Sequence, residues 1–383
     1  MWKIPLFDTA FDGKELEAAQ RVIRSGWLTM GEVTRRFERL FAELIGVKYA
    51  FAVSSGTAAL HLANLVLDIG KGDEVICPSL TFVAGANSIV YTGAIPVFAG
   101  ITALDDLNLS PEDVEAKITA RTKAIQTLHY AGHPSDMDRI MDIARRYGLR
   151  VIEDCAHAPG AGHNGKKCGA IGDIGCFSFF SNKNMTTAEG GMMTTNSEEL
   201  ARKIRLIRSH GMTSLTLDRH EGRASTYDVV KLGFNYRIDE IRSAIGLVQL
   251  EKLKESNERR KALTKIYRAR LKAFSEVSVP FEKERGGPSH HIFPVLLASH
   301  VDREGFMAFL KDRGVQTSIH YPPIHQFKFY ERNFECEKTS LRLTEEAGEK
   351  EITLPLYPSM KMEDVHYVCD VISKYFEQRG SLS

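Results

Sequence analysis

From about residue 50 to residue 195, short apolar runs alternate with amphipathic stretches of helical length. The runs with the length and composition of strands are 73–79, 95–101, 122–130 and 149–155. Helical patterns occupy 81–93 and 136–148 between them. Strands that alternate with helices of about 10–15 residues pack as a mainly parallel sheet with helices on both faces. This alternation therefore predicts an α/β fold built on a mainly parallel central sheet.

The pattern changes after residue 176. Two apolar runs flank the loop SNKNMTTAEGG (181–191), which predicts a strand–loop–strand excursion with the loop at the sheet edge. Beyond about residue 240, a long charged helix leads into a remainder with three expected strands and a closing helix. The expected strands are 290–297, 315–323 and 352–359, and the closing helix is 364–378. We therefore predict a large domain over 1–245 and a smaller C-terminal α+β domain over 246–383, joined by the long helix.

Composition restricts the location of the protein and the partners that it can have. The chain has 383 residues, is 43% hydrophobic and carries a formal net charge of +1, which argues against a basic nucleic-acid-binding face. The N-terminus places Asp8 and Asp12 where a signal peptide would need an apolar core. No run approaches the roughly 20 apolar residues that span a bilayer. The scattered cysteines indicate reduced thiols, so we expect a cytoplasmic protein with no nucleic-acid or membrane partner.

Two of the loops at strand ends suit a flat, phosphorylated ligand, because ligands of open parallel sheets bind at the carboxyl ends of strands. In SSGTAAL (54–60), the backbone N–H groups of Gly56 and Thr57 would face outward at the positive end of a helix and could bind a phosphate. Residues of this kind also serve simply as helix caps. Phe82 follows the strand at 73–79, where its ring could stack on a cofactor ring or belong to the core.

Two further strand ends carry a carboxylate and an amine. Asp154 ends the strand at 149–155 and could either pair with a protonated pyridine nitrogen or cap the next turn, whereas Glu153 points to the opposite face. Lys183 follows the apolar run CFSFF (176–180) with no nearby acid in the sequence. It is therefore either a surface lysine or an amine of lowered pKa suited to Schiff-base chemistry. Ser178 offers a hydroxyl for a phosphate. Together these groups match the parts of pyridoxal 5'-phosphate.

A metal site is the rival interpretation of this region. Its candidate ligands lie within a short span and are Cys155, His157, His163, Cys168 and Cys176. Their spacings match no closed tetrahedral pattern of paired ligands, so we predict no metal.

Over essentially its full length, the chain also resembles the DegT/DnrJ/EryC1/StrS family of sugar aminotransferases, which have the fold-type I, aspartate aminotransferase-like architecture. Eight segments match in the family's order. They are RSGWLTMG (24–31), SSGTAALH (54–61), PSLTFVAGANSI (78–89), HYAGHPSDMD (129–138), VIEDCAHA (151–158), FSFFSNKNMTTAEGG (177–191), GFNYRIDEIRSAIGLVQL (233–250) and IHYPPIHQ (319–326). Departures from the commoner pattern occur at Glu32, Gly100 and Ala188, none of which belongs to the cofactor set.

The resemblance implies a role for each residue of the cofactor set. Lys183 would carry the cofactor as a Schiff base, and Asp154 would pair with the pyridine nitrogen. The ring would lie between Phe82 and Ala156, and its phosphate would be held by Gly56, Thr57 and Ser178. Asn235 matches an asparagine that reaches the cofactor phosphate of the neighbouring subunit, which implies a homodimer with shared active sites. The residues expected to border the substrate are Arg237, Tyr321 and His325, although Arg237 could instead pair with Asp239 or Glu240.

The resemblance also implies the reaction. An amino group would move from an amino acid, L-glutamate in the family, to the ketone of a nucleotide-linked 3-keto or 4-keto sugar (UDP, dTDP or GDP). The product would be an amino sugar for a surface polysaccharide or a glycosylated metabolite. Relatives that dehydrate deoxysugars carry His at the position of Lys183, so lysine favours transamination. A cyclitol ketone is the alternative substrate, and a non-enzymatic regulator is the alternative class, against which the set Lys183, Asp154 and Ser178 argues.

Overall fold

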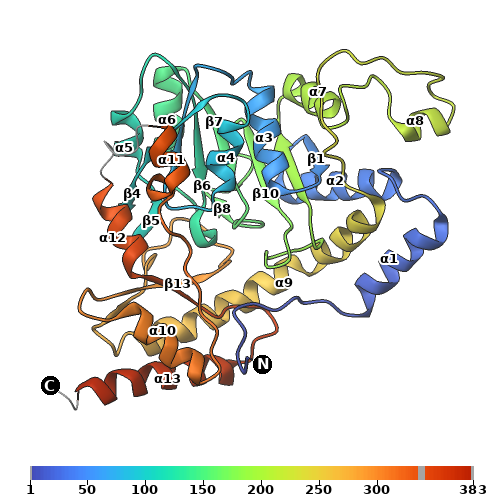
Figure 1. The fold of residues 1–383 in the computed structure, drawn as a ribbon. Helices are drawn as coiled ribbons and strands as arrows, with labels where there is room; N and C mark the ends of the chain where they lie inside the picture. The colour runs from blue at the N-terminus through green and yellow to red at the C-terminus, as the bar shows by residue number, and fades with distance from the viewer. Residues whose placement is uncertain (1, 335–340, 381–383) are drawn as a thin grey trace.

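The computed structural model describes residues 2–334 and 341–380, and its centre is a seven-stranded sheet (Figure 1). The strand order is β1-β11-β10-β7-β6-β2-β3. These strands are β1 (Tyr49–Val53), β2 (Glu74–Pro78), β3 (Ile95–Ala99), β6 (Thr122–Leu128), β7 (Arg150–Asp154), β10 (Ile174–Ser178) and β11 (Gly191–Thr195). The five strands from β3 to β10 are parallel, and β11 runs antiparallel to both β10 and β1. The predicted mainly parallel α/β sheet is confirmed.

Helices cover both faces of this sheet because neighbouring strand residues point to opposite sides. In β1, Phe51 packs into an apolar cluster with helices α3 and α7, while Ala50 and Ala52 pack into a cluster with α2. The helices of this part are α1 (Gly13–Ser25), α2 (Glu32–Ile45), α3 (Gly56–Val66), α4 (Ala84–Val90), α5 (Pro111–Ala116), α6 (Met137–Tyr147), α7 (Glu198–Ile207) and α8 (Thr216–His220). Two small hairpins complete it, β4 (Ile101–Ala103) with β5 (Asp106–Leu109) and β8 (Gly162–His163) with β9 (Lys166–Lys167).

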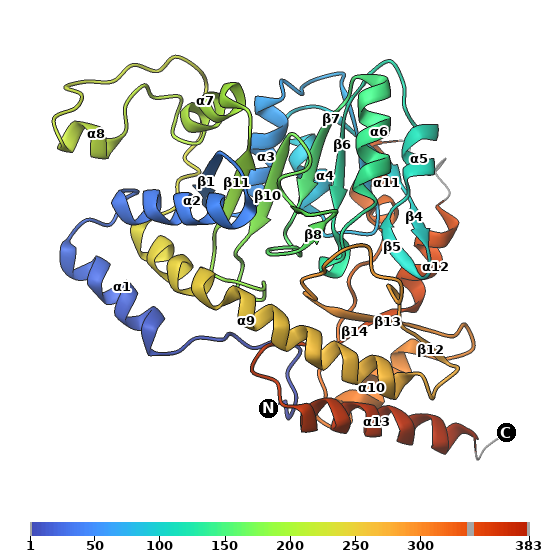
Figure 2. The ribbon, with the colours of Figure 1, turned by 180° about the vertical axis from the view of Figure 1, so that it is seen from behind.

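The long helix α9 (Glu240–Leu271) leads into a second group of elements, as its sequence predicts (Figure 2). A three-stranded antiparallel sheet has the order β12-β13-β14. Its elements and the helices around it are β12 (Val277–Ser278), β13 (Phe293–Leu297), β14 (Glu351–Leu354), α10 (Arg303–Asp312), α11 (Lys328–Asn333), α12 (Arg342–Lys350) and α13 (Met362–Gly380). Its apolar cluster draws mainly on residues from 263 onward, whereas Leu247, Leu250 and Leu253 of α9 pack with the cluster of α2 and the large sheet, so the division at residues 245 and 246 stays a proposal.

One predicted strand of this group is wrong. Residues 315–323 form isolated bridges only, between Val315 and Ile4 and between Ser318 and Thr353. The run ends in Pro322 and Pro323, which have no backbone N–H to donate to a ladder. The chain here instead follows an irregular path that carries His320 and Tyr321 toward the main sheet.

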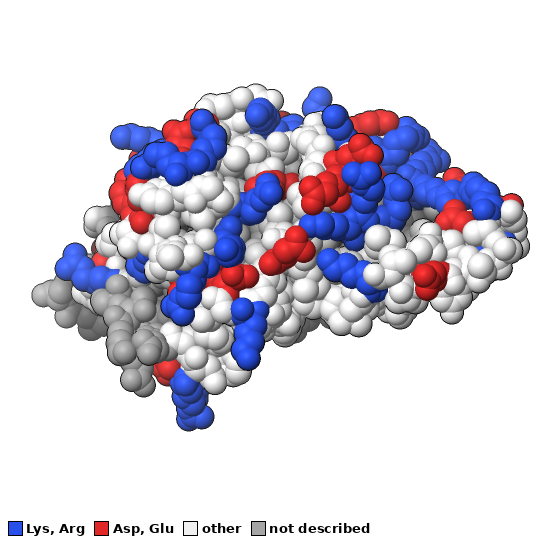
Figure 3. All heavy atoms as spheres, turned by 90° about the horizontal axis from the view of Figure 1, so that it is seen from above, with Lys and Arg blue, Asp and Glu red and all other residues white. Residues whose placement is uncertain are grey.

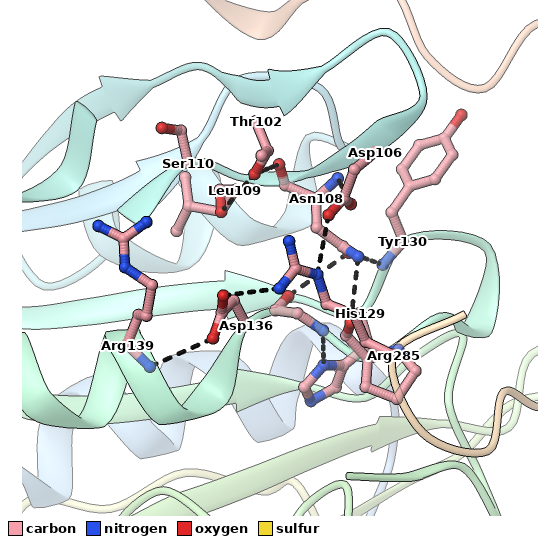
Figure 4. Close-up of polar contacts among 12 residues, drawn as sticks. Thr102, Asp106, Asn108, Leu109, Ser110, His129, Tyr130, Asp136, Arg139 and Arg285 are labelled. Carbon is pink, nitrogen blue, oxygen red and sulfur yellow. Dashed lines mark hydrogen bonds and ion pairs between the residues drawn. The ribbon is translucent and has the colours of Figure 1, made fainter. Parts of the chain in front are cut away.

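Polar side chains join the large sheet to the segment that precedes β13 (Figure 4). Arg285 donates to Asp106 at 3.1 Å and to Asp136 at 2.7 Å, so it connects the β4–β5 hairpin with the start of α6. Asn108 accepts from the backbone N–H of Tyr130 at 2.9 Å and donates to the carbonyl of Pro134 at 3.2 Å. These bonds fix the turn that follows β6, close to the strand ends where the candidate residues lie.

Candidate active site

A cavity of about 390 Å³ lies at the carboxyl ends of β7 and β10, beside the start of α3. Eight of the predicted residues line it, namely Gly56, Thr57, Phe82, Asp154, Ala156, Ser178, Lys183 and Tyr321. They come from five separate segments of the sequence and meet because parallel strands end at one edge of the sheet. A larger hollow of about 540 Å³, between α2 and α7, contains none of the predicted residues.

Lys183 and Asp154 form the charged centre of this cavity. Burial lowers the pKa of Lys183 to about 8, and the charge of Asp154 acts in the opposite direction. Burial raises the pKa of Asp154, whereas the N–H of Ala156 and the charge of Lys183 lower it. Asp154 accepts one hydrogen bond, on Oδ1 from Ala156 at 3.0 Å, and its Oδ2 has no protein partner among the described residues. A cationic group in the cavity could therefore pair with this oxygen.

The other acid at the end of β7, Glu153, has a structural environment. As the alternation of strand side chains predicts, it lies on the opposite face of the sheet from Asp154, and it is fully buried. Its carboxylate accepts hydrogen bonds from the backbone N–H groups of Gly169, Ile171 and Gly172 at 2.7–2.9 Å and from His129 Nε2 at 3.1 Å. Glu153 thus fixes the turn that leads into β10.

We expect Glu153→Ala to destabilise the fold and leave the chemistry intact. The change removes the acceptor of three backbone N–H groups, that of Gly169 buried and those of Ile171 and Gly172 half-buried, and an unsatisfied buried N–H costs ~1–3 kcal/mol. The free energy of unfolding should fall by about 3–5 kcal/mol in a urea titration. Glu17→Ala, on the exposed face of α1, is the matched control and should change it by less than about 0.5 kcal/mol. A loss as small as the control's would contradict the structural role.

The start of α3 can bind an anion. Ser55 caps the helix by accepting from the N–H of Ala58 at 3.1 Å, which leaves the N–H groups of Gly56 and Thr57 without partners among the described residues. A side chain at Gly56 would place its Cβ 2.7 Å from Cβ of Ser178, so only glycine allows β10 to approach this closely. The Ser178 side chain lies beside these free donors as a result.

The rim of the cavity is aromatic and polar. Phe82 is 59% exposed, and its ring lies 6.1 Å from that of Tyr321. His157 Nε2 lies 3.0 Å from the hydroxyl of Tyr321, and His320 Nδ1 lies 2.9 Å from Thr353 Oγ1. Among the lining residues that the sequence analysis did not assign to this site are Asn182, Glu189 and His320, together with His157, which it considered only as a metal ligand. Adjacency was the available signal, because each lies within a few residues of a predicted one in a matching segment.

Three predicted residues lie outside the lining of this cavity. The backbone of Asn235 pairs with Ser209. Arg237 donates to the Ser209 hydroxyl at 2.9 Å and, within the described ranges, forms no ion pair with Asp239 or Glu240. His325 is buried, with Nδ1 2.7 Å from Ser79 Oγ and Nε2 3.1 Å from Glu345. These three residues therefore do not contribute to the cavity of this chain.

Among the residues that the structure describes, three side chains that could bind a metal ion lie close together. His129, Glu153 and Cys168 have potential ligand atoms within 4.8 Å of one another, and only Cys168 belongs to the set considered from the sequence. The carboxylate of Glu153 is already occupied by four hydrogen bonds. The arrangement is therefore accounted for by protein groups alone.

Surface features add two observations. Within the described ranges, no helix combines the length and the apolar character needed to cross a membrane. Figure 3 shows Lys and Arg side chains interspersed with Asp and Glu over the face seen from above.

Comparison with known proteins places the chain among aminotransferases. An uncharacterized protein of Methanocaldococcus jannaschii is 40% identical over 97% of both chains. The structure resembles that of Helicobacter pylori PseC, an aminotransferase involved in pseudoaminic acid biosynthesis, with a TM-score of 0.90, 30% identity and coverage of 98% of this chain and 99% of that one. It also resembles the PLP-form of a putative sugar aminotransferase from Streptococcus pneumoniae, with a TM-score of 0.90, 28% identity and coverage of 98% and 99%. Residues 10–373 match the family model, so the chain belongs to the DegT/DnrJ/EryC1/StrS aminotransferase family.

Proposed function

We propose that this chain is a pyridoxal-phosphate-dependent aminotransferase that moves an amino group from L-glutamate to the ketone of a nucleotide-linked sugar. The observation that carries the proposal is the meeting of a half-buried lysine of lowered pKa, a buried carboxylate and an unpaired helix start in one cavity. A charged side chain shielded from water and a helix start with free N–H groups are unfavourable without a partner. Pyridoxal phosphate offers a partner to all three groups.

The residues present fit that cofactor. Lys183 would hold it covalently, Oδ2 of Asp154 would face its ring nitrogen, and Gly56, Thr57 and Ser178 would hold its phosphate. Phe82 and Ala156 would lie against the ring. When bound, the cofactor supplies a conjugated ring that draws electrons away from the carbon bearing the substrate's amine.

The chain's own residues then move and hold protons. Lys183 Nζ, with a pKa of about 8, can accept a proton from the α-carbon of the amino donor and then donate it to a different atom. Asp154 keeps a proton on the ring nitrogen through its negative charge. Phe82 and the irregular segment with His320 and Tyr321 border the cavity and limit the access of water. Lys183 is therefore proposed as the proton carrier and Asp154 as its electrostatic support.

The acceptor is proposed to be a keto-sugar. The cavity rim offers hydrogen-bonding groups from Asn182, His157, His320 and Tyr321, which suit hydroxyl groups, and no arginine lines it among the described residues. Arg237 and His325, which the family resemblance implies near the substrate, are proposed as substrate-binding residues. A cyclitol ketone, also rich in hydroxyls, is the alternative acceptor.

A half-reaction test separates these acceptors. Protein loaded with pyridoxamine phosphate would be offered UDP-, dTDP- and GDP-linked 3-keto and 4-keto sugars, with a keto-inositol in parallel. We expect a nucleotide-linked sugar to restore the aldehyde form of the cofactor, with the amino sugar detected by mass spectrometry. Turnover of the keto-inositol alone would reject the nucleotide-sugar proposal. Borohydride reduction and peptide mapping should place the cofactor on Lys183, and label on another lysine would reject that assignment.

We also propose a homodimer in which Asn235 completes the partner's site. Large apolar side chains stand exposed on and after α1 and in the segment 227–232: Leu16, Ile23, Leu28, Tyr227, Val229, Val230 and Leu232, the last 84% exposed. An apolar surface of this kind is typical of a subunit interface. Light scattering should give twice the chain mass of 42.8 kDa. The double variant Val230→Asp with Leu232→Asp should be monomeric, whereas Leu343→Asp should remain dimeric.

A further inference from the structure

One face of α9 is cationic and packs against the segment that leads into β13. Arg260, Thr264 and Arg268 are spaced four residues apart, so they share this face. Arg268 donates to the carbonyl groups of Pro280 and Phe281 at 3.2 and 2.8 Å. The positive charges of Arg260 and Arg268 contribute to the lowered pKa of His290, whose ring meets that of His133.

His133 completes the cluster from the side of the large sheet. Its ring is stacked on Phe281 at 4.2 Å and meets His290 edge-on at 5.6 Å. Burial and the nearby positive charges lower the pKa of His290 to about 4 and that of His133 well below its usual value. Both imidazoles are therefore neutral at pH 7.

The polar atoms of this cluster are buried and lack protein partners among the described residues. They are Nε and Nη1 of Arg260, Oγ1 of Thr264, Nε of Arg268, Nε2 of His290 and Nδ1 of His133. Arg260 is only 4% exposed and makes no ion pair with a described carboxylate. The charges of Glu282 and Glu284 raise the pKa of Arg268, but burial lowers it by more.

The chemistry of these atoms points to an anionic acceptor. Arginine nitrogens donate only, and burial that lowers the pKa of Arg260 to about 9 leaves it protonated at pH 7. A buried guanidinium without a counter-charge or hydrogen bonds is strongly unfavourable. Water can accept hydrogen bonds but cannot neutralise the charge. We propose that Arg260, Thr264, Arg268, His290 and His133 form a buried binding site for a small inorganic anion, between α9 and the segment that leads into β13.

The anion site would link the large sheet with the group of elements that follows α9, close to the loop that carries Lys183. His291, next to His290, donates from Nδ1 to Oδ1 of Asn184 at 2.8 Å. Asn184 in turn donates to Asn257 of α9 at 2.8 Å. An anion on Arg260 therefore stabilises the same packing that holds the residue following Lys183. Its expected effect is on folding stability, because none of its ligands lines the active-site cavity.

The test is anion-dependent thermal unfolding of the dialysed full-length protein. Phosphate, sulfate and chloride would be titrated separately at an ionic strength fixed with sodium gluconate. At about 100 times Kd, the melting temperature of the wild type should rise by ~3–5 °C. Arg260→Met should abolish this rise, and Arg259→Met, which removes the same charge from the exposed neighbour, should retain it. An equal rise in both variants, or none in the wild type, would overturn the proposal.

A crystal soak of the wild type decides the matter even if Arg260→Met does not fold. Bromide should give an anomalous peak within about 3.5 Å of an Arg260 nitrogen. Ordered water alone at that position would overturn the proposal. A peak without any stabilisation in solution would identify an adventitious ion only and would overturn it equally.

Discussion

Replacing Lys183 with alanine is expected to lower the rate of amino transfer by about 10⁴-fold, because the amine supplies both the covalent anchor and the proton carrier. Lys183→Arg should be as inactive, since a guanidinium remains protonated and cannot form the covalent bond. The measurement is amino-sugar formation followed by mass spectrometry, together with the cofactor content after borohydride treatment.

Lys166→Ala provides the matched control for this experiment. Lys166 is an exposed lysine on β9 and lies outside the cavity, so its loss should leave the rate within about twofold. If Lys183→Ala retained activity close to that control, Lys183 could be neither the anchor nor the proton carrier.

Asp154→Asn should separate function from stability. The amide keeps the shape of the carboxylate but loses the charge that holds a proton on the ring nitrogen, so kcat should fall by about 10²–10³-fold. Because burial raises the pKa of Asp154 in the folded protein, its ionised carboxylate is less favourable in the folded state than in the unfolded state and costs folding free energy above the unfolded-state pKa. The melting temperature of the cofactor-free variant should therefore equal or exceed that of the wild type.

The comparison is made between kcat, KM and the melting temperature of the cofactor-free protein. Asp138→Asn changes an exposed acid in the first turn of α6 and should alter none of the three by a measurable amount. A large fall in stability in Asp154→Asn would indicate a structural role for Asp154 and contradict its proposed pairing with the ring nitrogen.

The sheet could be predicted from sequence because its signal is local. Strands β2, β3, β6 and β7 each coincide with a predicted run, and helix α5 carries Ser110 as its cap and Pro111 as its first residue. The irregular course of 315–323 could not, because alternating side chains suggest a strand while the bridges to Ile4 and Thr353 depend on packing far along the chain.

The residues of the site also differ in whether local sequence predicts them. Gly56, Asp154 and Lys183 follow local strand ends, and the rule that parallel strands end at one edge brings them together. His157 and His320 have no such local signature, and their place in the cavity follows from the path of the chain after β7 and before β14. Asn235 and Arg237 contact Ser209 of the same chain and do not reach the cavity. Their roles at the site therefore stay proposals.

The contact between Gly56 and Ser178 also limits how new substrate preferences could arise in this protein. With only 2.7 Å available for a Cβ, the floor of the cavity cannot be reshaped without separating α3 from β10. The exposed rim around Phe82 has no such restriction. A library for directed evolution should therefore randomise Asn182 and His320 and leave positions 56, 82 and 178 unchanged. Divergence among natural descendants of this gene would be expected to follow the same division.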